Sequence, residues 1–195
     1  MADTGARPLV LLDVDGPLNP YAAKPEKRPA GYTTHWVKPA SWVASNPHGR
    51  PRPAAYTRPL RLWLNPDHGS WLRSLGGDLV WASTWMHEAN EFIGPRIGLP
   101  HLPVIEWRRM DRFDPDGLHW KTREILDWVG DGRSFVWIDD EITDADRAWV
   151  AGNHAGPALL HRVHPAIGLT REDIDAVAAW VSAAFGGRAS AAAAG

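Results

Sequence analysis

Two carboxylates near the start of the chain, Asp13 and Asp15, are spaced as a catalytic or metal-binding pair. They follow an apolar run at residues 9–12, within the segment PLVLLDVDGPLN, that has the length and aliphatic content of a buried β-strand. Side chains two residues apart point to the same side of a strand, so both carboxylates are expected together where the strand ends. Ligands bind at that edge of an open α/β sheet, and two like charges there favour a cation or a reaction. An ordinary Asp-Gly turn capped by Asp13 is the structural alternative.

Other polar residues stand where they could join this pair. Two more predicted strands end in polar pairs, and one predicted helix begins near a lysine: Ser83 with Thr84, Asp139 with Asp140, and Lys121. Because the carboxyl ends of parallel strands meet at one edge of a sheet, we expect hydroxyl, ammonium and carboxylate groups to converge there. The structural alternative is that the strand-end residues cap helices and that the lysine faces solvent.

The rest of the chain alternates between strand and helix patterns. Apolar runs bounded by turn residues predict strands at residues 9–12, 78–82, 104–107, 134–138 and 158–163. Apolar periodicity with start and stop signals predicts helices at residues 65–75, 86–93, 120–129, 143–150 and 170–185. Gly94-Pro95 is expected to end the second helix, and Thr143 with Asp146 to form a capping box for the fourth. This alternation predicts one α/β domain over residues 1–185, with a five-stranded, mainly parallel sheet covered on both faces. Residues 186–195 are expected to form a disordered tail.

Residues 20–64 form a proline-rich insertion that differs in composition from the rest. It has one acidic residue, Glu26, against eight basic ones: Lys24, Lys27, Arg28, Lys38, Arg50, Arg52, Arg58 and Arg61. It also holds six aromatic residues: Tyr21, Tyr32, Tyr56, Trp36, Trp42 and Trp63. Residues 32–37 and 60–64 resemble strands that pair as a hairpin, so we interpret the insertion as a flap or small cap. Its basic and aromatic side chains could bind a phosphate chain and stack bases, or the aromatics could pack onto the domain.

Composition excludes several classes of protein. The 195 residues carry a net charge of −2, so there is no general signature of polyanion binding. The absence of cysteine excludes disulfides, thiol catalysis and thiolate metal sites. No stretch has the pattern of a signal peptide or the length of a membrane span, so we expect a soluble cytoplasmic protein with no membrane partner.

The ordered motifs resemble the haloacid-dehalogenase-like (HAD) superfamily. The resemblance rests on the DVDG strand end, the Ser/Thr strand end, the lysine at a helix start and the acidic pair, which together span residues 13–140. A second Asp in the first motif is typical of the phosphatase branch. The strings VWASTWMHEAN and HWKT are also similar to HAD domains of multi-enzyme RNA-repair proteins and their stand-alone bacterial relatives. Pro17 departs from the usual Thr or Val. The resemblance implies a Rossmannoid three-layer sandwich.

The resemblance also implies a role for each site residue. Asp13 would be the nucleophile that forms an aspartyl-phosphate, and Asp15 the acid and base whose backbone carbonyl also ligates Mg²⁺. Lys121 would bind the phosphate together with a hydroxyl, for which Ser83 is preferred to Thr84. The implied activity is that of a Mg²⁺-dependent phosphomonoester hydrolase. The basic, aromatic flap favours a nucleic-acid end or nucleotide as the substrate, with nucleic acid bound through the flap. A small-metabolite phosphatase and a non-catalytic binding module are the alternatives.

Electrostatics independently favour a cation at such a site. A phosphate dianion beside Asp13, Asp139 and Asp140 would gather about five negative charges, and each unit pair at ~4 Å repels by roughly 4 kcal/mol at an effective dielectric constant of 20. Mg²⁺ and Lys121 together supply about three positive charges. We therefore expect Asp139 and Asp140 to be metal ligands, with Asp140 the direct one and Asp139 acting through water.

Overall fold

A four-stranded parallel sheet lies at the centre of the protein. The computed structural model describes residues 7–44, 54–108, 110 and 114–192, with the backbone alone for residues 54 and 185–192. The strand order is β4-β1-β5-β6, and neighbouring strands are parallel. The strands are β1 (Leu9–Leu12), β4 (Asp78–Trp81), β5 (Phe135–Asp139) and β6 (Ala158–Arg162). The α/β class and parallel sheet predicted from the sequence are confirmed.

The predicted fifth strand at residues 104–107 is wrong. Val104 forms only an isolated bridge with Trp81, at the free edge of β4. Main-chain bonds from Trp81 N to Pro103 O (2.9 Å) and from Ile105 N to Trp81 O (2.9 Å) flank this bridge. Pro103 has no N–H to donate, which limits a ladder on its side. The indole N–H of Trp107 instead donates to the main-chain oxygen of Ser83 (3.0 Å). This segment therefore lies against the sheet edge without forming a strand.

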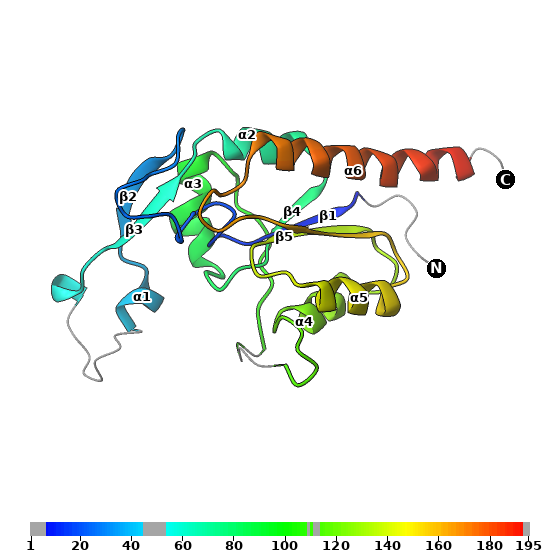
Figure 1. Ribbon diagram of the computed structural model, residues 1–195, viewed down its shortest axis with the longest axis horizontal. Coiled ribbons are helices and arrows are strands. Elements are labelled where there is room, and N and C mark those ends of the chain that lie inside the picture. Colours follow the sequence, from blue (N-terminus) through cyan, green and yellow to red (C-terminus); the bar gives the residue numbers. More distant parts are fainter. Residues whose placement is uncertain (1–6, 45–53, 109, 111–113, 193–195) are drawn as a thin grey trace.

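Helices cover both faces of the sheet, giving three layers (Figure 1). One face carries α2 (His68–Ser74), α3 (Gly94–Ile97) and α6 (Arg171–Ala192), and the other carries α4 (Thr122–Val129) and α5 (Asp144–Asn153). Alternate β1 residues enter two separate cores: Val10 packs in the core with α2 and α6, and Leu11 in the core with α4 and α5. Among the described residues, no helix is long and apolar enough to cross a membrane.

Local capping explains where several helices begin and end. The predicted capping box of α5 is confirmed, because Thr143 accepts from Asp146 N and the Asp146 carboxylate accepts from Thr143 N. The predicted helix end at Gly94-Pro95 is wrong: a π-helical turn, η2 (Ala89–Ile93), runs directly into α3. Pro95 lies in the first turn of α3, where the missing N–H needs no partner, and the helix ends at Ile97 with Gly98 as its C-cap. Helix α6 continues to Ala192, beyond the predicted end at residue 185, and residues 193–195 lie outside the described chain.

The insertion at residues 20–64 contains the predicted hairpin. Strand β2 (Thr33–Val37) pairs antiparallel with β3 (Leu60–Leu64), and α1 (Ala40–Ala44) and a short 3-10 turn, η1 (Ala54–Tyr56), lie between them. Val37, Leu62 and Leu64 join the core on the side of α2 and α6. The hairpin extends beyond the end of β1 and β5 (Figure 1). The insertion therefore lies at the end of the sheet where the predicted site residues follow their strands.

Buried His68 is expected to make folding stability depend on pH. Its ring packs edge-on against Tyr32, 5.4 Å between ring centroids, and its Nε2 lies 3.0 Å from the main-chain oxygen of Leu169. Burial lowers the pKa of His68 from 6.5 to about 4. Between these two pKa values the unfolded chain therefore binds more protons at His68 than the folded chain does. The contribution of buried, neutral His68 to the free energy of unfolding is complete above about pH 6.5 and is lost as the pH falls toward about 4.

Urea unfolding of wild type and His68→Phe at about pH 7.5 and about pH 4.5 measures this effect. Wild type is expected to lose about 2 to 3 kcal/mol more unfolding free energy between the two pH values than the variant does. Equal losses in the two proteins would show that His68 does not titrate as its burial requires.

Candidate active site

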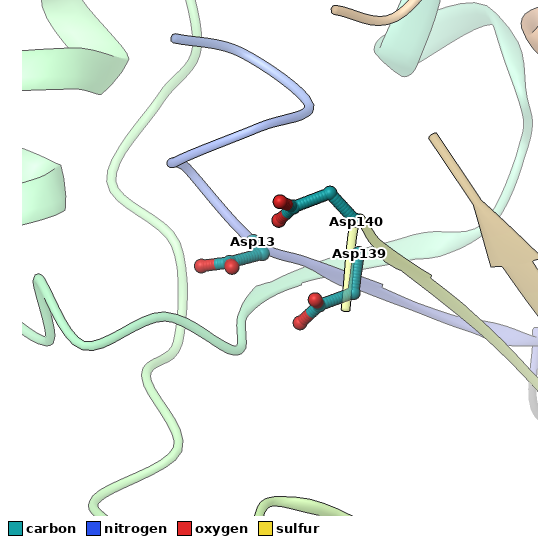
Figure 2. A group of neighbouring side chains, drawn as sticks. All are labelled: Asp13, Asp139 and Asp140. Carbon is teal, nitrogen blue, oxygen red and sulfur yellow. The ribbon is translucent and has the colours of Figure 1, made fainter. Parts of the chain in front are cut away.

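Three carboxylates converge where β1 and β5 end. These strands are neighbours with Leu12 opposite Ile138, so Asp13 and Asp139 follow paired positions, and Asp140 comes next along the chain. All three residues are buried, and one oxygen from each lies within 4.8 Å of the others. Figure 2 shows the three carboxyl groups projecting from these strand ends toward the same side. The sequence-based expectation that the two distant motifs meet is confirmed.

Lys121, the residue immediately before α4, adds an ammonium group to these three carboxylates. Its Nζ lies 3.0 Å from Asp13 Oδ2 and 2.8 Å from Asp139 Oδ2, and the residue is 2 % exposed. The solvent-facing alternative for this lysine is therefore wrong. Burial alone lowers the pKa of Lys121, but the two carboxylates outweigh it and raise the pKa, so the ammonium stays charged.

Hydrogen bonds join the start of α4 to the start of α5, and they position Lys121. Asp146, in the first turn of α5, accepts from the hydroxyl of Thr122 (2.6 Å) and from the main-chain N–H of His119 (2.8 Å). The main-chain N–H of Lys121 donates to His119 Nδ1 (3.1 Å). Asp146 is fully buried, so one carboxylate joins the two helices in the core. The sequence predicted Asp146 as a cap but gave no signal for this second role.

The site carries more carboxyl groups than its one lysine can neutralise. Burial raises the pKa of Asp13 to about 7; Lys121 and Ser83 oppose this rise, and Asp139 and Asp15 add to it. Burial also raises the pKa of Asp140 to about 6, with Asp139 adding to the effect. Asp139 differs: burial acts to raise its pKa, but Lys121 and His119 outweigh burial and lower it. Asp139 is thus the ionised partner of Lys121, and Asp13 and Asp140 need a further positive charge to ionise fully.

The donor set fits a hard divalent cation such as Mg²⁺, which prefers carboxylate oxygen ligands. The two neighbouring aspartates differ in their contacts. Asp139 Oδ1 accepts from Glu141 N (2.9 Å), and its Oδ2 accepts from Lys121 and from the indole of Trp137 (3.2 Å). Asp140 Oδ2 accepts from the hydroxyl of Tyr21 (3.1 Å). These contacts favour Asp140 over Asp139 as the direct metal ligand, which remains a prediction.

Gly16 allows Asp140 to approach the first motif. Its φ of +89° lies in the left-handed region, and a Cβ at this position would stand 2.4 Å from Asp140 Cγ. The chain then reverses, with Gly16 N donating to Asn19 O (2.9 Å). Any side chain at this position would push the carboxylate away, so the glycine of the DVDG motif is required by both backbone and packing.

Of the two candidate hydroxyls, the structure brings Ser83 to the site. Ser83 is fully buried after β4, and its hydroxyl acts to lower the pKa of the Asp13 carboxyl. Thr84 is exposed. Strand β4 pairs with β1 with Trp81 opposite Leu12, so the residues that follow the two strands lie at the same end of the sheet. Of the two hydroxyls that follow β4, the structure buries Ser83 and exposes Thr84.

The side chain of Asp15 lies outside the group of three carboxylates. Its Oδ1 accepts from Asn19 Nδ2 (2.7 Å), and its Oδ2 accepts from the indole N–H of Trp85 (2.8 Å). Burial raises the pKa of Asp15, and both donors act against that rise. No feature of the sequence linked Asn19, Tyr21 or Trp85 to the acidic residues of the site. The Gly16-Pro17 pair predicts a turn, and this turn was the one sequence signal that could have indicated the contact between Asn19 and Asp15.

Comparison with known proteins agrees with this geometry. A scan against protein families matches residues 9–174 to the family described as "HAD domain in Swiss Army Knife RNA repair proteins". The search of curated proteins and the search of solved structures each gave no match. The matched region contains the whole sheet and every site residue described above. The chain belongs to the HAD domain family of Swiss Army Knife RNA repair proteins.

Proposed function

We propose that the protein is a Mg²⁺-dependent phosphomonoester hydrolase that works through an aspartyl-phosphate on Asp13. The observation that carries the proposal is the buried contact of Lys121 with Asp13 and Asp139, beside Asp140. Structural ion pairs rarely gather three acids around one lysine in the core, because the desolvation cost exceeds the gain. Such a group is expected where a metal ion and a phosphate bind.

Asp13 and Asp140 would hold the Mg²⁺ ion through side-chain oxygens, with the main-chain carbonyl of Asp15 as a further ligand and Asp139 acting through water. When bound, the ion supplies the positive charge that lets a phosphate dianion approach these carboxylates. Binding of the ion would also favour the ionised form of Asp13, whose pKa of about 7 otherwise leaves part of it protonated at neutral pH. Ionisation of Asp13 is what a nucleophile needs.

The protein's own residues then account for each step. The Asp13 carboxylate attacks phosphorus, the bond from phosphorus to the leaving oxygen breaks, and Asp15 gives its proton to that oxygen. Water next attacks the phosphorus of the aspartyl-phosphate while Asp15 takes its proton, which releases phosphate and restores Asp13. Lys121 and the hydroxyl of Ser83 bind the equatorial oxygens, where charge develops. Trp85 and Asn19 orient Asp15 through both of its oxygens.

The substrate we propose is the phosphorylated end of a nucleic acid or a nucleotide. The position of the basic, aromatic insertion beyond the strand ends supports this choice. A small-metabolite phosphate is the alternative within the same chemistry.

Phosphate release from a chromogenic aryl phosphate, with Mg²⁺ and with EDTA, tests the proposed reaction. We expect turnover with Mg²⁺ and none with EDTA. End-phosphorylated RNA and DNA, compared with a panel of sugar phosphates, then test the substrate class. Equal turnover with and without the metal, or no turnover of any phosphomonoester, would refute the proposed function.

Trp85→Phe is expected to change the pH dependence of turnover. It removes the indole N–H that favours ionised Asp15, so the pKa of Asp15 should rise further. The limb of the pH–rate profile in which Asp15 acts as a base should move to higher pH, with a rate loss of about tenfold near neutral pH. Trp128→Phe, at a 40 % exposed position on α4, is the matched control. An unchanged profile in Trp85→Phe would remove Trp85 from this role.

A further inference from the structure

The outer face of the β2–β3 hairpin holds a groove that the proposed chemistry does not use. Its volume is about 490 Å³, and the residues lining it include Glu26, Arg28, Thr34, Trp36, Arg61 and Trp63. In the hairpin register Thr34 pairs with Trp63 and Trp36 pairs with Arg61. Directly paired residues share a face, so these four form one continuous surface opposite the residues that enter the core.

Two tryptophans line the groove: one is buried and forms its floor, and the ring of the other is exposed to solvent. Trp63 is 4 % exposed, its indole N–H donates to Thr34 Oγ1 (3.1 Å), and the Arg61 guanidinium lies 3.9 Å from its ring centroid. Trp36 is 63 % exposed. The floor is therefore fixed by packing and by a hydrogen bond, and the exposed ring of Trp36 is available for stacking.

The charged groups of the groove are mainly cationic and lack acidic partners. Arg28 donates to Thr34 Oγ1 (3.1 Å), and Arg61 donates to the main-chain oxygen of Pro25 (3.4 Å). Within the part of the chain that the structure describes, no carboxylate lies within 4.0 Å of either guanidinium. Glu26 is the acidic residue of the lining, and Lys24 and Lys27 flank it in the chain. Guanidinium groups left free of carboxylates bind phosphate well.

We propose that this groove binds a single-stranded nucleic-acid segment, with one base stacked on Trp36 and the neighbouring phosphates on Arg28 and Arg61. An exposed indole on the same surface as two guanidinium groups can stack a base and bind the phosphates that link it to its neighbours. The inference rests on the proposed function in one respect: the bound strand is taken to be the body of the substrate whose phosphorylated end reaches Asp13.

A short hydrogen-bonded path connects the groove to the candidate active site. The main-chain N–H of Trp63 donates to Asn19 Oδ1 (3.1 Å), and Asn19 Nδ2 donates to Asp15. Strand β3, which carries the groove floor, is thus anchored to the residue that orients Asp15. A nucleic acid bound in the groove would therefore lie beside the active site and not on a distant face.

Fluorescence anisotropy with an oligonucleotide phosphorylated at one end and labelled at the other tests the groove. Titrations in EDTA prevent turnover, and a labelled oligonucleotide avoids interference from the twelve tryptophans. Trp36→Ala is expected to weaken binding about tenfold or more, the usual effect of losing one stacked base. Replacing both Arg28 and Arg61 by alanine should make the negative slope of log K for binding against log salt concentration shallower by about 1.4, because two phosphate contacts are lost. Trp128→Ala and Arg147→Ala are the matched controls, and the melting temperature of each variant checks folding.

The outcomes separate this inference from the proposed function. Binding that depends on Trp36 and on the two arginines supports the groove. Binding that these variants leave unchanged overturns it, as does a wild-type protein that hydrolyses an aryl phosphate but binds no oligonucleotide; in the latter case the phosphatase proposal stands. If oligonucleotide binding needs Trp36 but no phosphomonoester is hydrolysed, the groove stands and the proposed function fails.

Discussion

Asp13→Asn is expected to lower Mg²⁺-dependent phosphate release from an aryl phosphate by about 10⁴-fold or more, because a neutral amide cannot act as the nucleophile. Stability should respond differently. Burial raises the pKa of Asp13 to about 7, so above this pH the ionised carboxylate costs folding free energy that a neutral side chain does not. In metal-free buffer above about pH 7 the variant should therefore unfold at the same temperature as wild type or higher.

The combination of lost activity and retained stability distinguishes a catalytic group from a structural one. Phosphate release and thermal unfolding are measured on the same preparations. Asp175→Asn, at a 66 % exposed carboxylate in α6, is the control and should leave both quantities unchanged. An Asp13→Asn protein that still hydrolyses the aryl phosphate at a tenth of the wild-type rate or faster would refute the nucleophile assignment.

Lys121→Met is expected to lower the free energy of unfolding by about 3 to 5 kcal/mol near neutral pH, the usual cost of leaving a buried charge unpaired. The substitution leaves the carboxylates of Asp13 and Asp139 without the ammonium that lies within 3.0 Å of both. Protonation of the two acids relieves the repulsion, so the loss should shrink as the pH falls. Urea unfolding followed by circular dichroism in metal-free buffer measures it, and phosphate release should also be lost.

A double substitution identifies the cause of that loss. Lys121→Met with Asp139→Asn removes one of the two repelling charges, so part of the stability should return while turnover stays absent. If the double variant loses the sum of the two single effects, the residues do not interact as the 2.8 Å contact indicates.

The sequence located the centre of the site because its members follow simple rules of strand geometry. Asp13 and Asp139 each come directly after an apolar run, and parallel strands bring such positions to one edge. Ser83 was located by the same rule because it follows β4, whereas the difference between buried Ser83 and exposed Thr84 is seen only in the structure. Lys121 was found by its place at the start of a helix, although its burial depends on contacts between α4 and α5 that no pattern in one segment could reveal.

The residues that sequence reasoning missed depend on how separate segments fold back on one another. Asn19 reaches Asp15 only because the chain reverses at Gly16, and Tyr21 reaches Asp140 from the far side of that turn. Trp85 is of a residue type that usually packs in the core, and only the hydrogen bond from its indole N–H to Asp15 shows its link to the site. The wrong strand at residues 104–107 has the opposite cause: a local apolar pattern was present, but Pro103 and the side-chain bond of Trp107 prevented a ladder.

Trapping of the phosphorylated protein tests the central claim most directly. The wild-type protein is mixed with a phosphomonoester and Mg²⁺, quenched in acid and reduced with borohydride, which converts a phosphorylated aspartate to homoserine. Mass spectrometry of the peptides should then find homoserine at position 13, only when both substrate and Mg²⁺ were present and never in Asp13→Asn. Phosphate release at the full rate with an unmodified Asp13, or with the modification at another residue, would contradict the account.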